Sequence, residues 1–319
     1  MSPVPNPLTE RIDALLRGEA TDLNAYVVPV GEVVGVPNSR ARVHCKLLAL
    51  DGRSLPRAGD LARFIANRVV DFAIPRTELL KAQDRDRRGN TAANVAALRK
   101  RAETPFVEAT TTGEGGELLL YVLVQTFLRL PQLFCKMSLK TSTEMHVHGI
   151  DGIHVGVDRT SGGLALYWGE SKLYGDFRQA LRRCLTDIKP FLCSDGGSES
   201  PFERDLQLVR DGLDLADEEL NEAILRFLDP DDAAYRSVTF RGVCLVGFDH
   251  SAYPVSPNQK DATTLLNEIS AELDSWVTTV EGLLTQATPL DGVDLEMFLL
   301  PFPSVQDFRN AFLRELGHA

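Results

Sequence analysis

The chain alternates between short apolar runs and longer stretches in which apolar positions recur every three to four residues. The short runs predict strands, and the recurring pattern predicts helices. The predicted strands span residues 41–50, 151–158, 163–172, 236–248 and 295–303, and the predicted helices span residues 59–74, 113–132, 175–188, 203–228, 260–287 and 304–317. Because strands alternate with helices, we expect an α/β fold with a central mixed β-sheet flanked by helices.

The helix at 113–132, "GEGGELLLYVLVQTFLRLPQ", is apolar on nearly every side, which is typical of a helix buried in a core. Its first turn carries Glu114 and Glu117, whose charges suit the positive end of the helix dipole. We expect this turn to approach the open end of the hairpin that follows, and the body of the helix to cover the apolar face of that hairpin.

Residues 148–172, "HGIDGIHVGVDRTSGGLALYWGESK", predict a β-hairpin with "RTSG" as its loop. The register that this loop imposes places Asp151 directly opposite Glu170. Side chains alternate between the two faces of a strand. One face is therefore apolar near the loop and carries Asp151, Glu170 and Lys172 at its open end.

Two carboxylates placed opposite each other repel, and burial at the edge of a core adds to the energy needed to ionise them. A positive charge should offset them, and the sequence offers Lys172. A hard divalent cation would do the same, since carboxylate oxygens are ligands of Mg²⁺ or Mn²⁺, which keep several waters and bind substrate phosphates. The alternative is a structural ion pair between the lysine and a carboxylate at the end of a strand.

This hairpin resembles the core of the PD-(D/E)xK, or restriction-endonuclease-like, superfamily. In that family an acidic residue leads the first strand and an ExK motif closes the second. Asp151 stands at the position of the metal-binding aspartate, with Ile150 in place of the family's proline. Glu170 and Lys172 stand at the ExK motif.

The same resemblance implies two further contributions to a metal site. Ser171, between the two ExK residues, would lend its backbone carbonyl to the metal. Many members also carry a glutamate on the preceding helix. Glu117 is the candidate for this position, and Glu114, at or before the helix start, is the alternative.

Three stretches, "GEGGELLLYVLVQ", "HGIDGIHVGVD" and "LYWGESKLYGD", are similar to the nuclease subunit of the bacterial Hachiman anti-phage system over about residues 113–190. The resemblance implies a metal-dependent nuclease that hydrolyses phosphodiester bonds of DNA, as the effector subunit of a complex with a helicase. It also implies a restriction-endonuclease-like core with C-terminal helices at residues 106–319, onto which residues 1–105 pack as an N-terminal elaboration in one compact unit.

The chain has a net charge of −11, and such an acidic balance argues against a protein that grips nucleic acid unaided. It fits a subunit that relies on a partner. No apolar run reaches about 18 residues and no secretory signal is visible, so we expect no membrane segment. The five scattered cysteines form no CxxC pair, which favours reduced thiols in the cytoplasm.

Arginines offer two candidate contacts for nucleic-acid phosphates. Arg178 and Arg182 lie one turn apart on the helix that follows the ExK strand, where they could meet the phosphates that flank the cut. A basic stretch at residues 81–101 is the other candidate, and its alternative interpretation is a solvated helix surface.

Two rival interpretations remain. His146, His148 and His154 lie near Asp151, but on a strand His146 and His148 share a face that excludes Asp151, which disfavours a histidine metal site. A non-catalytic, degenerate nuclease fold could instead dock a helicase or bind nucleic-acid ends, and the complete acidic and lysine set favours catalysis over it. The sequence leaves open DNA or RNA, single or double strands, endonuclease or exonuclease, how activity is restrained, and the oligomeric state.

Overall fold

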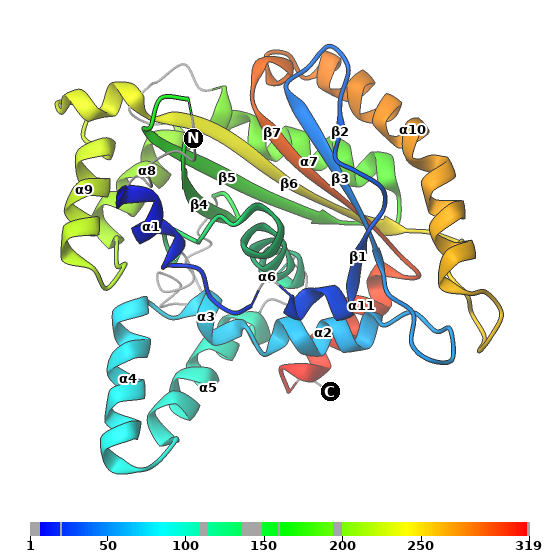
Figure 1. Ribbon diagram of the computed structural model, residues 1–319, viewed down its shortest axis with the longest axis horizontal. Helices are drawn as coiled ribbons and strands as arrows, with labels where there is room; N and C mark the ends of the chain where they lie inside the picture. The colour runs from blue at the N-terminus through cyan, green and yellow to red at the C-terminus, as the bar shows by residue number, and fades with distance from the viewer. Residues whose placement is uncertain are drawn as a thin grey trace, which may run out of the picture.

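A mixed β-sheet lies at the centre of the computed structural model, which describes residues 7–19, 21–108, 114–135, 149–158, 160–193 and 200–317 (Figure 1). The strand order is β1 (Val27–Pro29), β3 (Ala41–Leu48), β7 (Leu295–Phe302), β6 (Thr239–Asp249), β5 (Leu164–Leu173) and β4 (Gly152–Val157), and β2 (Val34–Gly35) also pairs with β3. The four inner strands are parallel, whereas β1, β2 and β4 are antiparallel to their neighbours. The sheet therefore confirms the predicted α/β class with a central mixed sheet.

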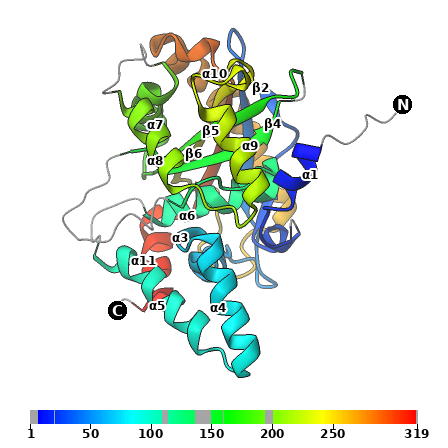
Figure 2. The same cartoon turned by 90° about the vertical axis from the view of Figure 1, so that its left-hand side faces the viewer.

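Helices cover both faces of this sheet (Figures 1 and 2). One face packs against α6 (Glu114–Leu123) and the π-helical turn Val124–Leu128, with α2 (Ala58–Ala66), α3 (Val69–Ala73) and α11 (Val305–Glu315) beside them. The other face packs against α7 (Phe177–Leu192), α8 (Pro201–Gly212) and α10 (Ala262–Gln286), and α9 (Glu218–Leu228) packs on α8. Strands β3 to β7 are buried along most of their length because each face has a helical layer.

The remaining elements lie at the N-terminal end of the chain and in connections. The short helix α1 (Pro7–Asp13) packs near β4, and α4 (Arg76–Gly89) and α5 (Ala93–Glu108) form a helical hairpin that projects from the body (Figures 1 and 2). Short 3₁₀ turns span Asp22–Ala25, Ala233–Ser237 and Leu290–Gly292. Across the described residues, every helix is too short or too polar to span a bilayer.

The helix expected to cover the apolar face of the hairpin lies on the opposite face. Trp168 points toward the other helical layer, where its ring lies 5.7 Å from Phe191 of α7 and 5.4 Å from Phe202 of α8. The α6 helix instead packs against Gly169, at whose position a Cβ atom would lie 3.1 Å from Leu120. The expectation was wrong because the sheet is apolar on both faces, and a helix that is apolar all round can pack on either.

Two predicted helices are each divided in two. The helix expected at 59–74 breaks at Asn67 and Arg68 into α2 and α3, and there Arg68 forms an ion pair with Asp22 from the preceding 3₁₀ turn. The helix expected at 203–228 breaks into α8 and α9, because Asp217 caps the second helix by accepting a hydrogen bond from the backbone N–H of Leu220. Each break changes the direction of the chain and lets both halves bury an apolar side.

Candidate functional site

The hairpin of β4 and β5 has the register that its loop predicts. Six residue pairs run from Gly152 opposite Gly169 to Val157 opposite Leu164. Asp158 closes the loop, since its Oδ1 accepts hydrogen bonds from the backbone N–H groups at positions 160 and 161 at 2.9 and 2.8 Å. This register brings the residue before β4, Asp151, to the open end of the hairpin.

Asp151 lies against the edge of β5 beyond the last paired residue of β4. Its backbone N–H donates to the carbonyl of Gly169 at 2.9 Å, and its Oδ2 accepts from the N–H and the hydroxyl of Ser171 at 2.8 and 2.7 Å. The N–H and C=O of one strand residue point to the same edge. The carbonyl of Ser171 therefore faces the same side as Asp151, as the resemblance requires for a ligand.

A buried aspartate on α8 fixes the backbone immediately before Asp151. Asp205 is 2% exposed, and its Oδ2 accepts a hydrogen bond from the backbone N–H of Ile150 at 3.2 Å. Its Oδ1 is held by the guanidinium of Arg204 at 2.9 and 2.8 Å. Sequence reasoning missed Asp205 because it lies 54 positions after Asp151 on an acidic helix where nothing in the pattern marks one carboxylate as buried.

Glu170 and Lys172 point to the face of the sheet that α7 covers. The side chain of Glu170 is 5% exposed and forms an ion pair with Lys172. Lys172 forms a second ion pair, at 3.1 Å, with Asp187 of α7, which in turn binds Arg183 at 3.1 Å. Asp187 and Arg183 were missed in the sequence, although their spacing of four residues on a predicted helix is a signal for an ion pair.

The electrostatics of this cluster are unbalanced toward negative charge. Burial, and then the charge of Asp151, raise the pKa of Glu170 to about 8, although Lys172 opposes the shift. Burial by itself would lower the pKa of Lys172, but the carboxylates of Glu170, Asp151 and Asp187 outweigh it and raise that pKa. Lys172 therefore stays charged, and the site disfavours a second full negative charge beside Asp151.

The donor set suits a hard divalent cation that keeps part of its water shell. Among the described residues, no three histidine, cysteine, aspartate or glutamate side chains are arranged to hold a metal ion by themselves. Within that part of the chain, Oδ1 of Asp151 and Oε2 of Glu170 accept no hydrogen bond. Two carboxylates supplemented by water and substrate oxygens are a usual way to bind Mg²⁺, so these two residues and the Ser171 carbonyl could hold it.

The first turn of α6 lies at the open end of the hairpin, as expected. A Cβ atom at Gly116 would lie 2.9 Å from the hydroxyl of Ser171, so glycine allows the helix to approach β5 closely at that position. Tyr121 of α6 contacts His154 of β4 at 6.3 Å between ring centroids. Glu117, half-buried and one turn before Tyr121, therefore lies on the β4 side of α6, toward the end where Asp151 lies.

Arg178 and Arg182 are exposed on α7, and Arg178 lies on the side that faces α10. Arg178 approaches Thr279 of α10 at 3.5 Å and lines a groove of about 620 Å³ with Phe177 and residues of α10. Nine positions separate Arg178 from Asp187, which at 100° per residue places them about 180° apart around the helix. A role for Arg178 and Arg182 in binding phosphates remains a prediction, on a flank of α7 opposite to Asp187.

The basic stretch at 81–101 lies on α4 and α5 and is partly neutralised. Three of its arginines form ion pairs with nearby carboxylates: Arg88 with Asp84, Arg99 with Glu103, and Arg101 with Glu78. These contacts agree with a solvated helix surface.

The histidines show no metal-binding arrangement in the described residues. His154 is 1% exposed, and its Nδ1 lies 3.0 Å from the carbonyl oxygen of Leu130. Burial lowers the pKa of His154 to about 4, so the ring is neutral inside the core. His146 and His148 lie outside the described residues.

Comparison with known protein families identifies the group to which the chain belongs. The family model described as HamA matches residues 28–316, from β1 to the end of α11. The chain belongs to the HamA family. HamA is a subunit of the Hachiman anti-phage defence system, which agrees with the resemblance found in the sequence. No curated protein matches the chain.

The HamA match extends well beyond the hairpin that first suggested the relationship. It includes β3, which lies inside the sheet next to β7 although it comes from the first 105 residues. It also includes α11, the last helix, which packs beside α6. The sheet and both helical layers around Asp151 and Glu170 therefore lie within the residues that the HamA family model matches.

Proposed function

We propose that this HamA chain is a metal-dependent nuclease that hydrolyses phosphodiester bonds of DNA and acts with a helicase as the effector of the Hachiman system. The observation that carries the proposal is the position of Asp151, Glu170 and Lys172 around the end of β5, in the register that a nuclease hairpin requires. The raised pKa of Glu170 supports it, since a cluster short of positive charge favours a bound cation.

The residues have separate roles in this proposal. Asp151, fixed by two hydrogen bonds from Ser171, and Glu170, on which the charge of Asp151 acts, would supply carboxylate oxygens to a cation at the edge of β5. Lys172, held between Glu170 and Asp187, donates hydrogen bonds that orient an attacking water or stabilise charge on a phosphate oxygen. A bound divalent cation would supply a water of lowered pKa and neutralise phosphate charge.

A second candidate function is that of a non-catalytic module that docks the helicase or binds nucleic-acid ends. The contact that favours it is the ion pairing of Lys172 with both Glu170 and Asp187, which links these three side chains directly to one another. Such networks also occur for purely structural reasons. The two candidates differ in whether the chain cleaves DNA.

The test is cleavage of plasmid DNA by the full chain, alone and with its helicase, in Mg²⁺ and in EDTA. We expect cleavage that requires Mg²⁺, and loss of more than about 100-fold in Glu170→Gln and Lys172→Met, because the first removes a carboxylate from the proposed cation site and the second removes a positive charge at the reacting phosphate. Glu222→Gln, an exposed carboxylate on α9, is the matched control and should cleave like the wild type. No cleavage by the wild type in either setting, or cleavage that survives Glu170→Gln, would refute the nuclease proposal.

A further inference from the structure

The edge of β5 beyond β4 carries one more charged group besides Asp151. Residues 169, 171 and 173 point their backbone N–H and C=O groups toward this edge, since Tyr174 donates its N–H the other way, to Gly247 of β6. Asp151 binds the backbone at positions 169 and 171. At the next position, the carbonyl of Leu173 accepts a hydrogen bond from Nη2 of Arg309 on α11.

The guanidinium of Arg309 has hydrogen-bond donors that the contact with Leu173 does not use. An arginine offers five N–H donors, and the hydrogen bond to Leu173 uses one of them. Its Nε is buried and has no hydrogen-bond partner among the described residues, and no carboxylate in that part of the chain lies within ion-pair distance of it. A half-buried cation without a carboxylate is unfavourable unless an anion arrives.

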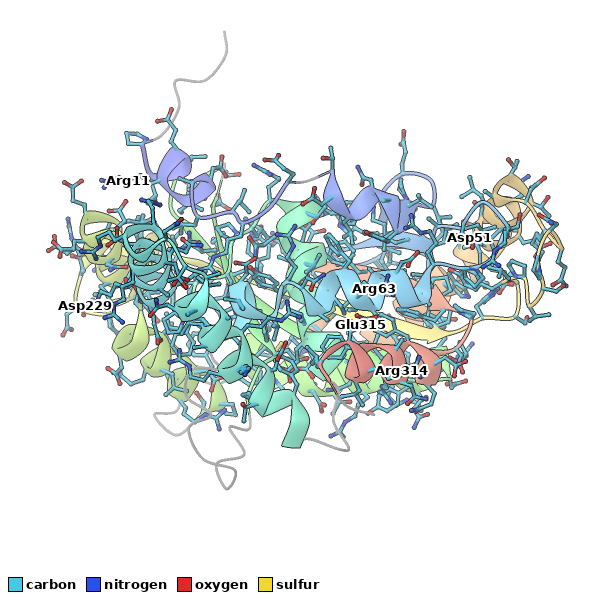
Figure 3. The ribbon with its side chains drawn as sticks, turned by 90° about the horizontal axis from the view of Figure 1, so that it is seen from below. Arg11, Asp51, Arg63, Asp229, Arg314 and Glu315 are labelled. Atoms are coloured by element: carbon cyan, nitrogen blue, oxygen red, sulfur yellow. The ribbon has the colours of Figure 1, made fainter. Side chains whose placement is uncertain are left out.

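The helix that carries Arg309 is held firmly beside the site. Phe312, one turn later on α11, lies where a Cβ atom at Gly115 of α6 would be 3.1 Å from its ring. Glu315 at the end of α11 forms an ion pair with Arg63 of α2 at 3.2 Å, and Figure 3 shows these two helices side by side. Arg309 therefore reaches β5 from a fixed support.

We propose that Arg309 binds a phosphate group of the nucleic-acid backbone next to Asp151 and Glu170. This inference rests on the proposed nuclease function and names a residue that would hold its substrate. Strand residues rise about 3.3 Å each, so the carbonyl of Leu173 lies roughly 7 Å along the edge from that of Ser171. An anion bound at the Asp151 end is thus within reach of the planar fork of Arg309, which suits phosphate oxygens.

The position of Arg309 differs from that of the arginines expected to grip the substrate. Arg178 and Arg182 lie on α7, on the other face of the sheet, with Arg178 on the flank that faces α10. Arg309 lies on the α6 side and contacts the strand that carries Glu170. Arg309, on the helix α11, would thus add a positive charge to the site that the hairpin residues form.

The test compares Arg309→Gln with Arg314→Gln, an exposed arginine on the same helix, and with Arg309→Lys. Glutamine has no charge and is shorter than arginine, whereas lysine keeps the positive charge. We expect Arg309→Gln to lower kcat/KM for a short DNA duplex in Mg²⁺ by about 10- to 100-fold, the range for a hydrogen bond to a charged group. Arg309→Lys should lose less, and Arg314→Gln should stay within about twofold.

Binding of the same duplex in EDTA, measured against salt concentration, gives a second readout. Loss of one phosphate contact should lower the slope of log K against log salt by about 0.9 in Arg309→Gln. A purely structural Arg309 predicts a wild-type salt slope in this variant, and that result overturns the inference while leaving the nuclease proposal intact. A wild type that binds through Arg309 but never cleaves overturns the nuclease proposal alone. A wild type that neither binds nor cleaves the duplex overturns both.

Discussion

Replacement of Glu170 by glutamine distinguishes a cation site from a structural ion pair, because the two predict opposite changes in stability. Burial and the charge of Asp151 raise the pKa of Glu170 from 4.5 to about 8. At pH 7 the folded chain must therefore keep a proton on a carboxyl group that the unfolded chain ionises, and this difference destabilises the fold by about 3 kcal/mol. Glutamine keeps the shape of the protonated side chain, so we expect Glu170→Gln to be more stable than the wild type by up to about 3 kcal/mol.

A structural ion pair predicts the reverse. Removal of one partner would leave a buried charge without compensation and would cost about 3–5 kcal/mol. Because Lys172 keeps Asp187 as a partner at 3.1 Å when Glu170 is neutralised, this loss would lie at the lower end of that range or below it. The sign of the stability change therefore decides between the two interpretations.

The assay is urea unfolding of the wild type, Glu170→Gln and the control Glu222→Gln at pH 7 in EDTA. A loss of more than about 1 kcal/mol in Glu170→Gln, with Glu222→Gln unchanged, would refute the reasoning. A second arm adds Mg²⁺. A cation bound by Glu170 stabilises the folded wild type by mass action and does so less in Glu170→Gln. Equal stabilisation of both proteins by Mg²⁺ would remove Glu170 from the proposed ligand set.

Three further predictions concern residues around the site. Gly116→Ala places a methyl group within 2.9 Å of a hydroxyl oxygen on β5 and should lower both stability and cleavage. Gly282→Ala, in open space on α10, should instead stabilise the chain by about 0.5–1 kcal/mol, and equal effects of the two variants on the melting temperature would contradict the close approach of α6 to β5. His154 has a folded-state pKa near 4, below its unfolded value of 6.5, so its contribution to stability is present above pH 6.5 and lost as the pH falls toward 4. His154→Asn should remove this pH dependence, which amounts to about 3 kcal/mol of unfolding free energy across that window, and an unchanged pH profile would contradict the buried neutral ring. Asp205→Ala removes the carboxylate that accepts the backbone N–H of Ile150, just before Asp151, and should reduce cleavage at least about tenfold. Arg204→Ala, at a side chain 47% exposed, should reduce cleavage less, and the reverse order of the two cleavage rates would contradict the role given to Asp205.

The sequence predicted the hairpin correctly because its register depends on local chemistry. A short loop closed by Asp158 fixes which residues pair, and a shift by one position would turn every side chain to the other face. The face on which Glu170 lies follows from that register, whereas Asp151 lies before the first paired residue of β4 and is placed by its hydrogen bonds to Ser171. The α/β class was predictable for the same reason, since each strand and helix has its own period.

The sequence could not predict which helix covers which face. The burial of β5 is nearly continuous, so alternation does not separate its two sides. A signal was present in the small residues: Gly152, Gly156 and Gly169 all point to the face where α6 packs, and glycine in a strand often marks close approach of another backbone. Contacts from distant segments, such as that of Arg309 with Leu173, depend on the complete fold and have no local pattern.

The balance of charge at the end of β5 links the structure to the proposed chemistry. Around the side chain of Glu170, three carboxylates (Asp151, Glu170 and Asp187) face two cations (Lys172 and Arg183), which leaves a net charge of minus one, whereas Arg309 lies farther along the edge at Leu173. The excess explains why the pKa of Glu170 is raised, because a proton on that carboxyl neutralises the cluster. A divalent cation in place of the proton would give a net charge of plus one, which a single phosphodiester group neutralises. One Mg²⁺ and one phosphodiester together carry a charge of plus one, which is the positive charge that the cluster lacks. This match favours a site for metal-assisted phosphodiester chemistry over an ion pair that is neutral by itself.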